Sequence, residues 1–172
     1  AQRSLPLVRD AETEALMRDY TYPIFDAAGI AREQVEVVLI NKRDFNAFVA
    51  DARHIFINVG VITDAETPGE VIGVLAHETG HIKGNHLARL RDAVANAQVM
   101  AAIGMILGVG AIAAGAGSNT GGLAQGGAGA LTAGAGLAQR SLLSYRRGEE
   151  SVADRAAVTF MNKAGISSRG ML

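Results

Sequence analysis

The sequence contains no cysteine and no tryptophan among its 172 residues, and only 5% of them are aromatic. The absence of cysteine excludes disulfide bonds, cysteine-ligated zinc, iron–sulfur centres and a thiol nucleophile. Neither sign of charge is in excess, because 16 Lys and Arg stand against 17 Asp and Glu. This balance argues against a nucleic-acid-binding protein, which normally has a basic surplus. We therefore expect no nucleic-acid partner.

The length and the 49% share of apolar residues predict one domain over residues 1–172 with a core of its own. Local patterns predict a mainly helical α+β fold with a small sheet of about three strands. The expected strands are Val35–Ile40, Asn46–Ala50 and His54–Asn58, antiparallel at least in part. The expected helices run from Asp10 to about Ala28, from Thr67 to Gly84, from His86 into the following block, from about Ala130 to Tyr145, from about Glu149 to Gly165 and from Ser167, with turns at Ser118–Gly122 and Gly126–Gly127.

The helix after Thr67 has a strong start signal. Thr67 is placed as the N-cap, Pro68 takes the first helical position, and Glu70 follows the cap by three residues. This spacing predicts a capping box, in which the two side chains satisfy each other's backbone N–H groups.

That helix carries His77-Glu78-Thr79-Gly80-His81, an HExxH motif. Residues four apart share one helical face, so both imidazoles can reach one metal ion. His77 and His81 are thus predicted zinc ligands, and Glu78 is the predicted general base for an attacking water.

A catalytic zinc site needs a third protein ligand. Glu150 is the favoured candidate because Asp154 follows it by one helical turn and can orient a ligand histidine. Two alternatives stay open. His86 lies near the helix end and also fits a polar residue behind the ligands, and Glu149 also fits an acidic helix start.

These motifs resemble the gluzincin metallopeptidase family that includes HtpX, BepA, LoiP and the CAAX prenyl proteases, and most closely the soluble BepA-like envelope members. The resemblance rests on LAHETGHIKGNH, on SYRRGEESVAD and on Asn46-Ala47-Phe48, in the same order along the chain. It implies one Zn²⁺ per chain, held by His77, His81 and Glu150.

The resemblance also implies further roles. Asp154 orients a zinc ligand, Arg147 is an ion-pairing, orienting residue, and the Asn46-Ala47-Phe48 strand borders the cleft and binds extended substrate. Tyr145 and Arg147 are weaker candidates for stabilising the transition state. The implied activity is endoproteolysis of misfolded or stalled envelope proteins in bacterial protein quality control.

Residues 93–139 contain no charged residue, and Gly and Ala dominate them. Three interpretations stay open: a helical hairpin that covers the cleft, contact with a membrane surface through residues 97–117, and a membrane span. The first is favoured, since Ala and Gly gain little free energy on transfer to lipid.

Two other functions also stay open, a latent, chaperone-like binding module with an intact zinc site and a membrane-anchored protease. The chain begins at Ala1 rather than Met, so we expect a processed or trimmed product. The resemblance implies a periplasmic location if a signal peptide is removed before Ala1, and it implies C-terminal segments after Leu172 in the full-length protein.

Overall fold

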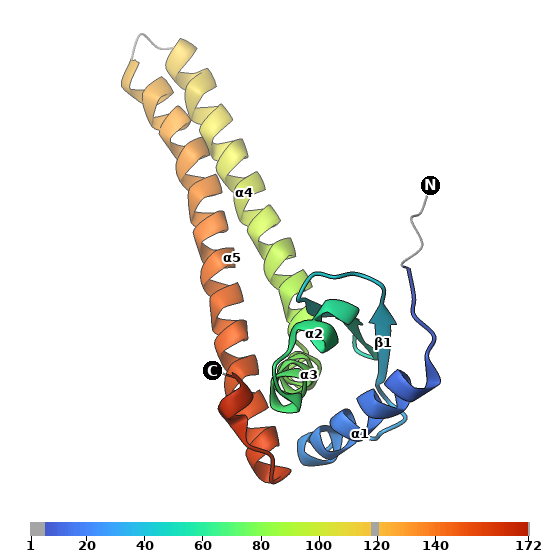
Figure 1. Cartoon of the computed structure of the whole chain (residues 1–172). Helices are drawn as coiled ribbons and strands as arrows, with labels where there is room; N and C mark the ends of the chain where they lie inside the picture. Colours follow the sequence, from blue (N-terminus) through green and yellow to red (C-terminus); the bar gives the residue numbers. More distant parts are fainter. Residues whose placement is uncertain (1–5, 118–120, 172) are drawn as a thin grey trace. The chain divides into compact units, whose positions relative to one another are not determined.

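The computed structural model describes residues 6–117 and 121–171 (Figure 1), although the side chains of some residues between 111 and 134 are not described. The chain forms two compact units, one of residues 1–87 with 149–172 and one of residues 88–148. We call the second unit the hairpin unit. The elements are α1 (Ala11–Ala28), β1 (Glu36–Ile40), β2 (Ala47–Asp51), β3 (His54–Asn58), α2 (Val59–Asp64), α3 (Pro68–Lys83), α4 (His86–Gly117), α5 (Gly121–Lys163) and the 3₁₀ helix η1 (Ser168–Met171).

The first unit contains the small sheet, in the order β1-β3-β2. β1 runs parallel to β3, and β2 runs antiparallel to β3. This confirms a mainly helical α+β fold with three strands. The outer edge of β1 is covered by the chain before α1, where Val8 N–H donates to Leu39 O at 3.0 Å. In the described part of the chain, no strand pairs with the outer edge of β2.

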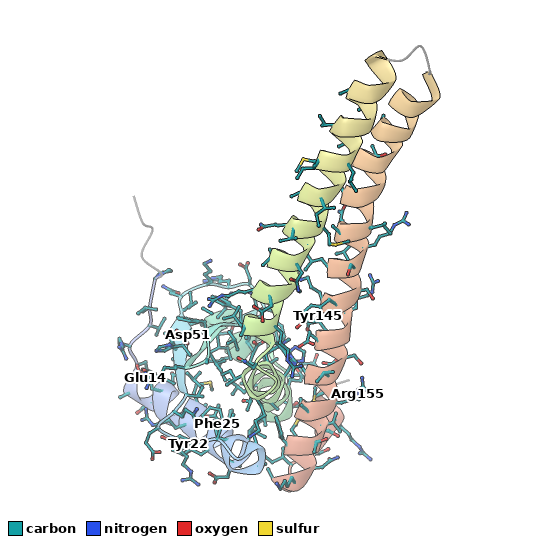
Figure 2. The ribbon with its side chains drawn as sticks, turned by 180° about the vertical axis from the view of Figure 1, so that it is seen from behind. Glu14, Tyr22, Phe25, Asp51, Tyr145 and Arg155 are labelled. Atoms are coloured by element: carbon teal, nitrogen blue, oxygen red, sulfur yellow. The ribbon has the colours of Figure 1, made fainter. Side chains whose placement is uncertain are left out.

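The core of this unit joins α1, the sheet, α3 and the end of α5. Phe25 on α1, labelled in Figure 2, is buried, as are Ile57 on β3, Leu75 on α3 and Met161 on α5. β1 and β3 bring mainly β-branched and leucine side chains to this core, which suits a pleated, buried surface. The core therefore fixes α3 against the sheet, and α3 is the helix that carries the HExxH motif.

Local signals place α1 and α3 correctly, with one correction at α3. Asp10 caps α1 by accepting from Thr13 N–H at 2.9 Å. At α3, Thr67 is the N-cap residue but its side chain makes no capping hydrogen bond. Glu70 reaches back instead to the backbone N–H of Glu66 at 3.0 Å. The predicted capping box is therefore wrong. The Glu70 carboxylate accepts from the backbone N–H of Glu66 rather than from that of Thr67.

The C-terminal helices differ more from expectation. A single helix, α5, covers Gly121–Lys163, so the turn at Gly126–Gly127 and the break between Tyr145 and Glu149 are wrong. Glycine lowers helix stability by only about 1 kcal/mol, which neighbouring turns offset. Residues 118–120 of the expected Ser118–Gly122 turn lie outside the described residues, and its last two begin α5. The sequence patterns also did not predict α2, which follows β3 directly.

The hairpin unit holds most of α4 and the first part of α5, which lie side by side and antiparallel in Figure 1. The stretch His86–Gly110 of α4 is long and apolar enough to cross a membrane, and its 18-residue apolar segment has a mean hydropathy of 1.7. Only 6% of that segment is buried. The apolar character of α4 is therefore not explained by burial in a protein core.

Candidate active site

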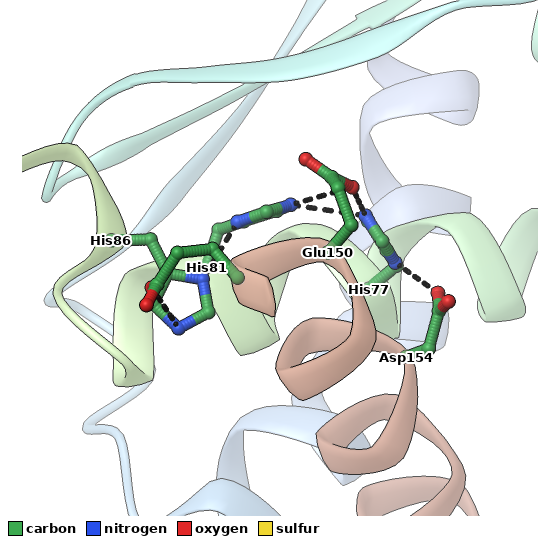
Figure 3. Close-up of polar contacts among 6 residues, drawn as sticks. His77, His81, His86, Glu150 and Asp154 are labelled. Carbon is green, nitrogen blue, oxygen red and sulfur yellow. Dashed lines mark hydrogen bonds and ion pairs between the residues drawn. The ribbon is translucent and has the colours of Figure 1, made fainter. Parts of the chain in front are cut away.

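The two motif histidines lie one turn apart on α3, and their Nε2 atoms are 3.0 Å from each other. Glu150 on α5 completes the cluster (Figure 3). Its Oε2 is 3.2 Å from Nε2 of His77 and 3.5 Å from Nε2 of His81. All three donor atoms thus converge on one point, and all three residues belong to the first unit.

These separations fit a zinc ion. Three tetrahedral ligands, each about 2.0–2.2 Å from Zn²⁺, have donor atoms roughly 3.4 Å apart. The observed separations of 3.0, 3.2 and 3.5 Å lie close to that value. Two imidazoles and one carboxylate are also a donor set typical of catalytic zinc, with the fourth position left for water.

The helix packing that brings Glu150 to the histidines depends on a glycine. A Cβ atom at Gly80 would lie 2.9 Å from the carbonyl oxygen of Ala153. Ala153 is fully buried on α5. Because Gly80 has no side chain, α3 and α5 approach closely there, next to His81 on α3 and within one turn of Glu150 on α5.

Asp154 lies behind His77, on the side away from the cluster. Its Oδ1 is 2.8 Å from Nδ1 of His77. A carboxylate at this nitrogen holds the proton there and leaves Nε2 with a free lone pair for a metal. The structure therefore brings Asp154 together with His77.

His81 has a different partner at its second nitrogen. Nδ1 of His81 is 2.9 Å from Nδ1 of His86, and Nε2 of His86 is 2.9 Å from Oε2 of Glu149. His86 is buried, and the side chain of Glu149 is 15% exposed. Both alternatives for the third ligand thus lie behind His81 rather than in the three-donor group.

Glu78 is buried beside the cluster, with 8% of its surface exposed. Burial raises the pKa of its carboxyl to about 7, the charge of Glu150 adds to this effect, and His77 opposes it. Burial also lowers the pKa of His81. The lowered pKa favours the neutral imidazole, which is the form that binds metal.

The predicted substrate strand lies on the open edge of the sheet. Ala47 and Phe48 belong to β2, and Asn46 directly precedes it and accepts from Asn58 N–H at 3.0 Å. β2 also packs against α3. Phe48 stacks on Phe56 of β3, with ring centroids 5.2 Å apart. The unpaired edge of β2 therefore lies in the same unit as the cluster and next to its helix.

Arg147 and Tyr145 lie on α5 in the hairpin unit, whereas the cluster belongs to the first unit. Their predicted roles stay predictions.

Sequence reasoning missed two features of the site. The first is Gly80, whose role depends on a helix crossing that spacing alone does not reveal. The second is the pairing of His86 with Glu149. The Gly84-Asn85 step before His86 is a signal for it, because such a step reverses the chain toward the preceding helix.

An HExxH helix, a carboxylate on a later helix and a buried glutamate beside them form the arrangement typical of metal-dependent peptidases. Residues 9–172 match peptidase family M48, and the chain belongs to that family.

Several curated relatives carry the name beta-barrel assembly-enhancing protease. The protein of Yersinia pestis is 26% identical over 168 residues, which cover 98% of this chain. The Escherichia coli K12 protein is 23% identical over 168 residues, also 98% of this chain. A protein of Vibrio cholerae with the same name, marked there as putative, is 25% identical over 169 residues, or 96% of this chain. The chain spans about a third of the length of these relatives, since 33% of each is covered.

Proposed function

We propose that the chain is a zinc-dependent endopeptidase whose metal is held by His77, His81 and Glu150. The observation that carries this proposal is the convergence of their three donor atoms within 3.5 Å, beside the buried carboxyl of Glu78. Membership of a peptidase family supports hydrolysis of peptide bonds as the reaction.

Zinc in this site would polarise the scissile carbonyl and make a bound water more acidic. Glu78 accepts a proton from the attacking water and passes it to the nitrogen of the leaving amine, while the carbon–nitrogen bond breaks. Burial raises the pKa of this carboxyl in the metal-free protein, and a zinc ion beside it would favour the carboxylate form that accepts the proton.

Extended or unfolded protein segments are the proposed substrates. The open edge of β2 offers backbone groups to an added strand, a mode of binding that reads the peptide backbone and selects weakly for sequence. The names of the relatives refer to β-barrel assembly. They support misfolded or stalled envelope proteins as natural substrates, and the bacterial periplasm as the place of action.

The test is hydrolysis of an unstructured fluorogenic peptide, together with the zinc content of protein prepared without chelator. We expect one zinc per chain, and we expect Glu78→Gln to lower kcat at least 10²-fold while zinc stays bound. Glu33→Gln makes the same chemical change at an exposed position of the first unit and serves as the control.

Protein that binds no zinc would contradict the proposal. Protein that binds one zinc but cleaves no peptide would instead favour a latent, chaperone-like binding module.

A further inference from the structure

The hairpin unit exposes a large apolar surface on α4. Seven long apolar side chains are between 47% and 72% exposed, namely Val99, Met100, Ile103, Met105, Ile106, Leu107 and Val109. At 3.6 residues per turn, they spread over about 220° of the helix circumference. A stripe that packs on a protein partner is about 100° wide. A second copy of the chain would therefore leave much of this surface in water, whereas lipid surrounds a helix from all open sides.

The dimensions and the charges of the hairpin also fit a bilayer. The uncharged part of α4, residues 93–117, is roughly 37 Å long, and that of α5, residues 121–139, is roughly 28 Å. The hydrocarbon core of a bilayer is about 30 Å thick. Within the hairpin unit, exposed arginines lie at its open end, at positions 91, 140, 146 and 147, and Asp92 is the one acidic residue of residues 88–148. Anionic headgroups attract such a basic group.

We propose that the hairpin unit inserts into an anionic lipid bilayer. The exposed face of α4 lies among the acyl chains, and the arginines lie at the headgroups. The small residues of α5 let its backbone pack closely against α4, which limits the polar backbone surface offered to lipid.

The absence of tryptophan allows a direct test on the whole chain. A single tryptophan placed by Ile106→Trp reports its own surroundings, and Leu16→Trp on α1 is the matched control, because Leu16 is also exposed. On addition of phosphatidylglycerol-containing vesicles, we expect Ile106→Trp to show blue-shifted emission and quenching by brominated lipids. Leu16→Trp should show neither.

Vesicle co-sedimentation measures how strongly the protein partitions into the bilayer. Ile106→Lys should lower partitioning roughly 100-fold, since a charge in the hydrocarbon core is costly, whereas Leu16→Lys should not change it. The combined change Arg91→Gln and Arg140→Gln should weaken binding to anionic vesicles only. Unchanged emission of Ile106→Trp with vesicles would overturn the proposal. So would a blue shift that depends on protein concentration without lipid, which would assign the surface to a second copy of the chain.

A separate observation concerns the residues behind His81. Gly84 has αR backbone angles, and Asn85 adopts φ of 53° in the left-handed region. This turn folds His86 back onto α3, where a Cβ atom at Gly84 would clash with the imidazole of His86. The chain is thus shaped to place a buried histidine against a metal-ligand histidine.

The proton positions in this group follow from the proposed zinc site, on which this inference rests. His81 directs Nε2 at the cluster, so its proton lies on Nδ1. That N–H donates to Nδ1 of His86 across 2.9 Å, which leaves the proton of His86 on Nε2. Nε2–H of His86 then faces the Glu149 carboxylate, with Nε2 2.9 Å from Oε2.

The geometry points to His86 and Glu149 as positioning residues that orient His81 as a zinc ligand. Asp154 contacts His77 directly, whereas Glu149 acts on His81 through His86. Both ligand histidines therefore have a carboxylate behind them.

Zinc affinity, measured by competition with a chromophoric chelator, tests this inference without relying on activity. His86→Leu and Glu149→Gln should each raise the zinc dissociation constant about 10–100-fold, the usual scale for groups that orient a ligand. In a double-mutant cycle, Glu149→Gln should add little to His86→Leu, because both act on one ligand. Asp154→Asn should add its full effect to either, because it acts on His77.

Different results would overturn the proposed zinc site and the positioning role of His86 and Glu149. Parent protein that binds no zinc would overturn the proposed function itself. Parent protein that binds zinc, with unchanged affinity in Glu149→Gln and in folded His86→Leu, would overturn only the positioning role. Full additivity of the two changes would also overturn it, because the two residues would then act independently.

Discussion

At the scale of single residues, Asp154 lies against His77, a predicted zinc ligand. A carboxylate at Nδ1 of a histidine favours the tautomer that leaves Nε2 available for a metal. We predict that Asp154→Asn keeps the fold and weakens zinc affinity about 10–100-fold. Chelator competition measures the affinity and circular dichroism checks the fold. Equal affinity in the two proteins would remove Asp154 from the site.

The buried carboxyl of Glu78 makes the free energy of unfolding of the metal-free protein depend on pH. Its pKa is about 7 in the folded chain, against 4.5 for an ordinary glutamate. Between these two values the folded state holds a proton that the unfolded state has released, so the free energy of unfolding falls as the pH rises. Above pH 7 the loss is complete and amounts to about 3 kcal/mol.

We therefore predict that Glu78→Gln is more stable than the parent in chelator at pH 8, and that the difference shrinks toward pH 4.5. Urea unfolding at several pH values measures both proteins. A difference that does not vary with pH would show that burial leaves the carboxyl of Glu78 unperturbed.

At the scale of helices and strands, the crossing of α3 and α5 is held together at Gly80. We predict that Gly80→Ala lowers the free energy of unfolding by about 1–3 kcal/mol, because the new Cβ meets the backbone of Ala153. Zinc affinity should fall with it, since α5 carries Glu150. Gly148→Ala is the matched control, because a Cβ there meets nothing within 4 Å.

For the control we expect the opposite sign, a gain of about 0.5–1 kcal/mol from helix propensity. Chemical denaturation measures both variants. A loss of equal size in both would mean that the helix crossing tolerates a side chain at Gly80.

The elements that sequence reasoning predicted well have local causes. Asp10 and Gly29 bound α1 through a side-chain cap and a left-handed glycine, and both signals are readable in the sequence. β1 and β3 follow from segments rich in valine and isoleucine. The spacing of HExxH predicted that His77 and His81 share a face, since that needs only helical geometry.

The features that local sequence patterns did not predict depend on contacts between residues distant in the chain. The parallel pairing of β1 with β3 is a matter of topology. The sequence pattern predicts a break between Tyr145 and Glu149, yet α5 continues through it to Lys163. His86 and Glu149 are 63 positions apart in the sequence, and only the folded structure shows that the first residue of α4 lies against α5 there.

At the scale of the whole molecule, the two units differ in what stabilises them. The clustered core belongs to the first unit, whereas α4 leaves its apolar side chains exposed. All the residues of the three-donor group also belong to the first unit. The uncharged stretch is thus inserted between the two sequence motifs of the site without contributing a ligand to it.

We predict that the first unit keeps its fold and its zinc without the apolar part of the hairpin. Residues 93–139 would be replaced by a short Gly-Ser turn that joins Asp92 on α4 to Arg140 on α5, two helices that lie side by side in Figure 1. This leaves the charge of the chain unchanged, because the removed stretch has none.

The shortened chain should bind one zinc with the affinity of the parent and unfold cooperatively, because its core residues are intact. It should no longer bind anionic vesicles, although all its arginines remain, because headgroup attraction without acyl-chain contact is weak and screened by salt. Zinc titration, thermal unfolding and vesicle co-sedimentation at low and high salt measure the three properties. Loss of zinc binding would show that the two units depend on each other, and retained vesicle binding at high salt would locate the lipid contact outside the hairpin.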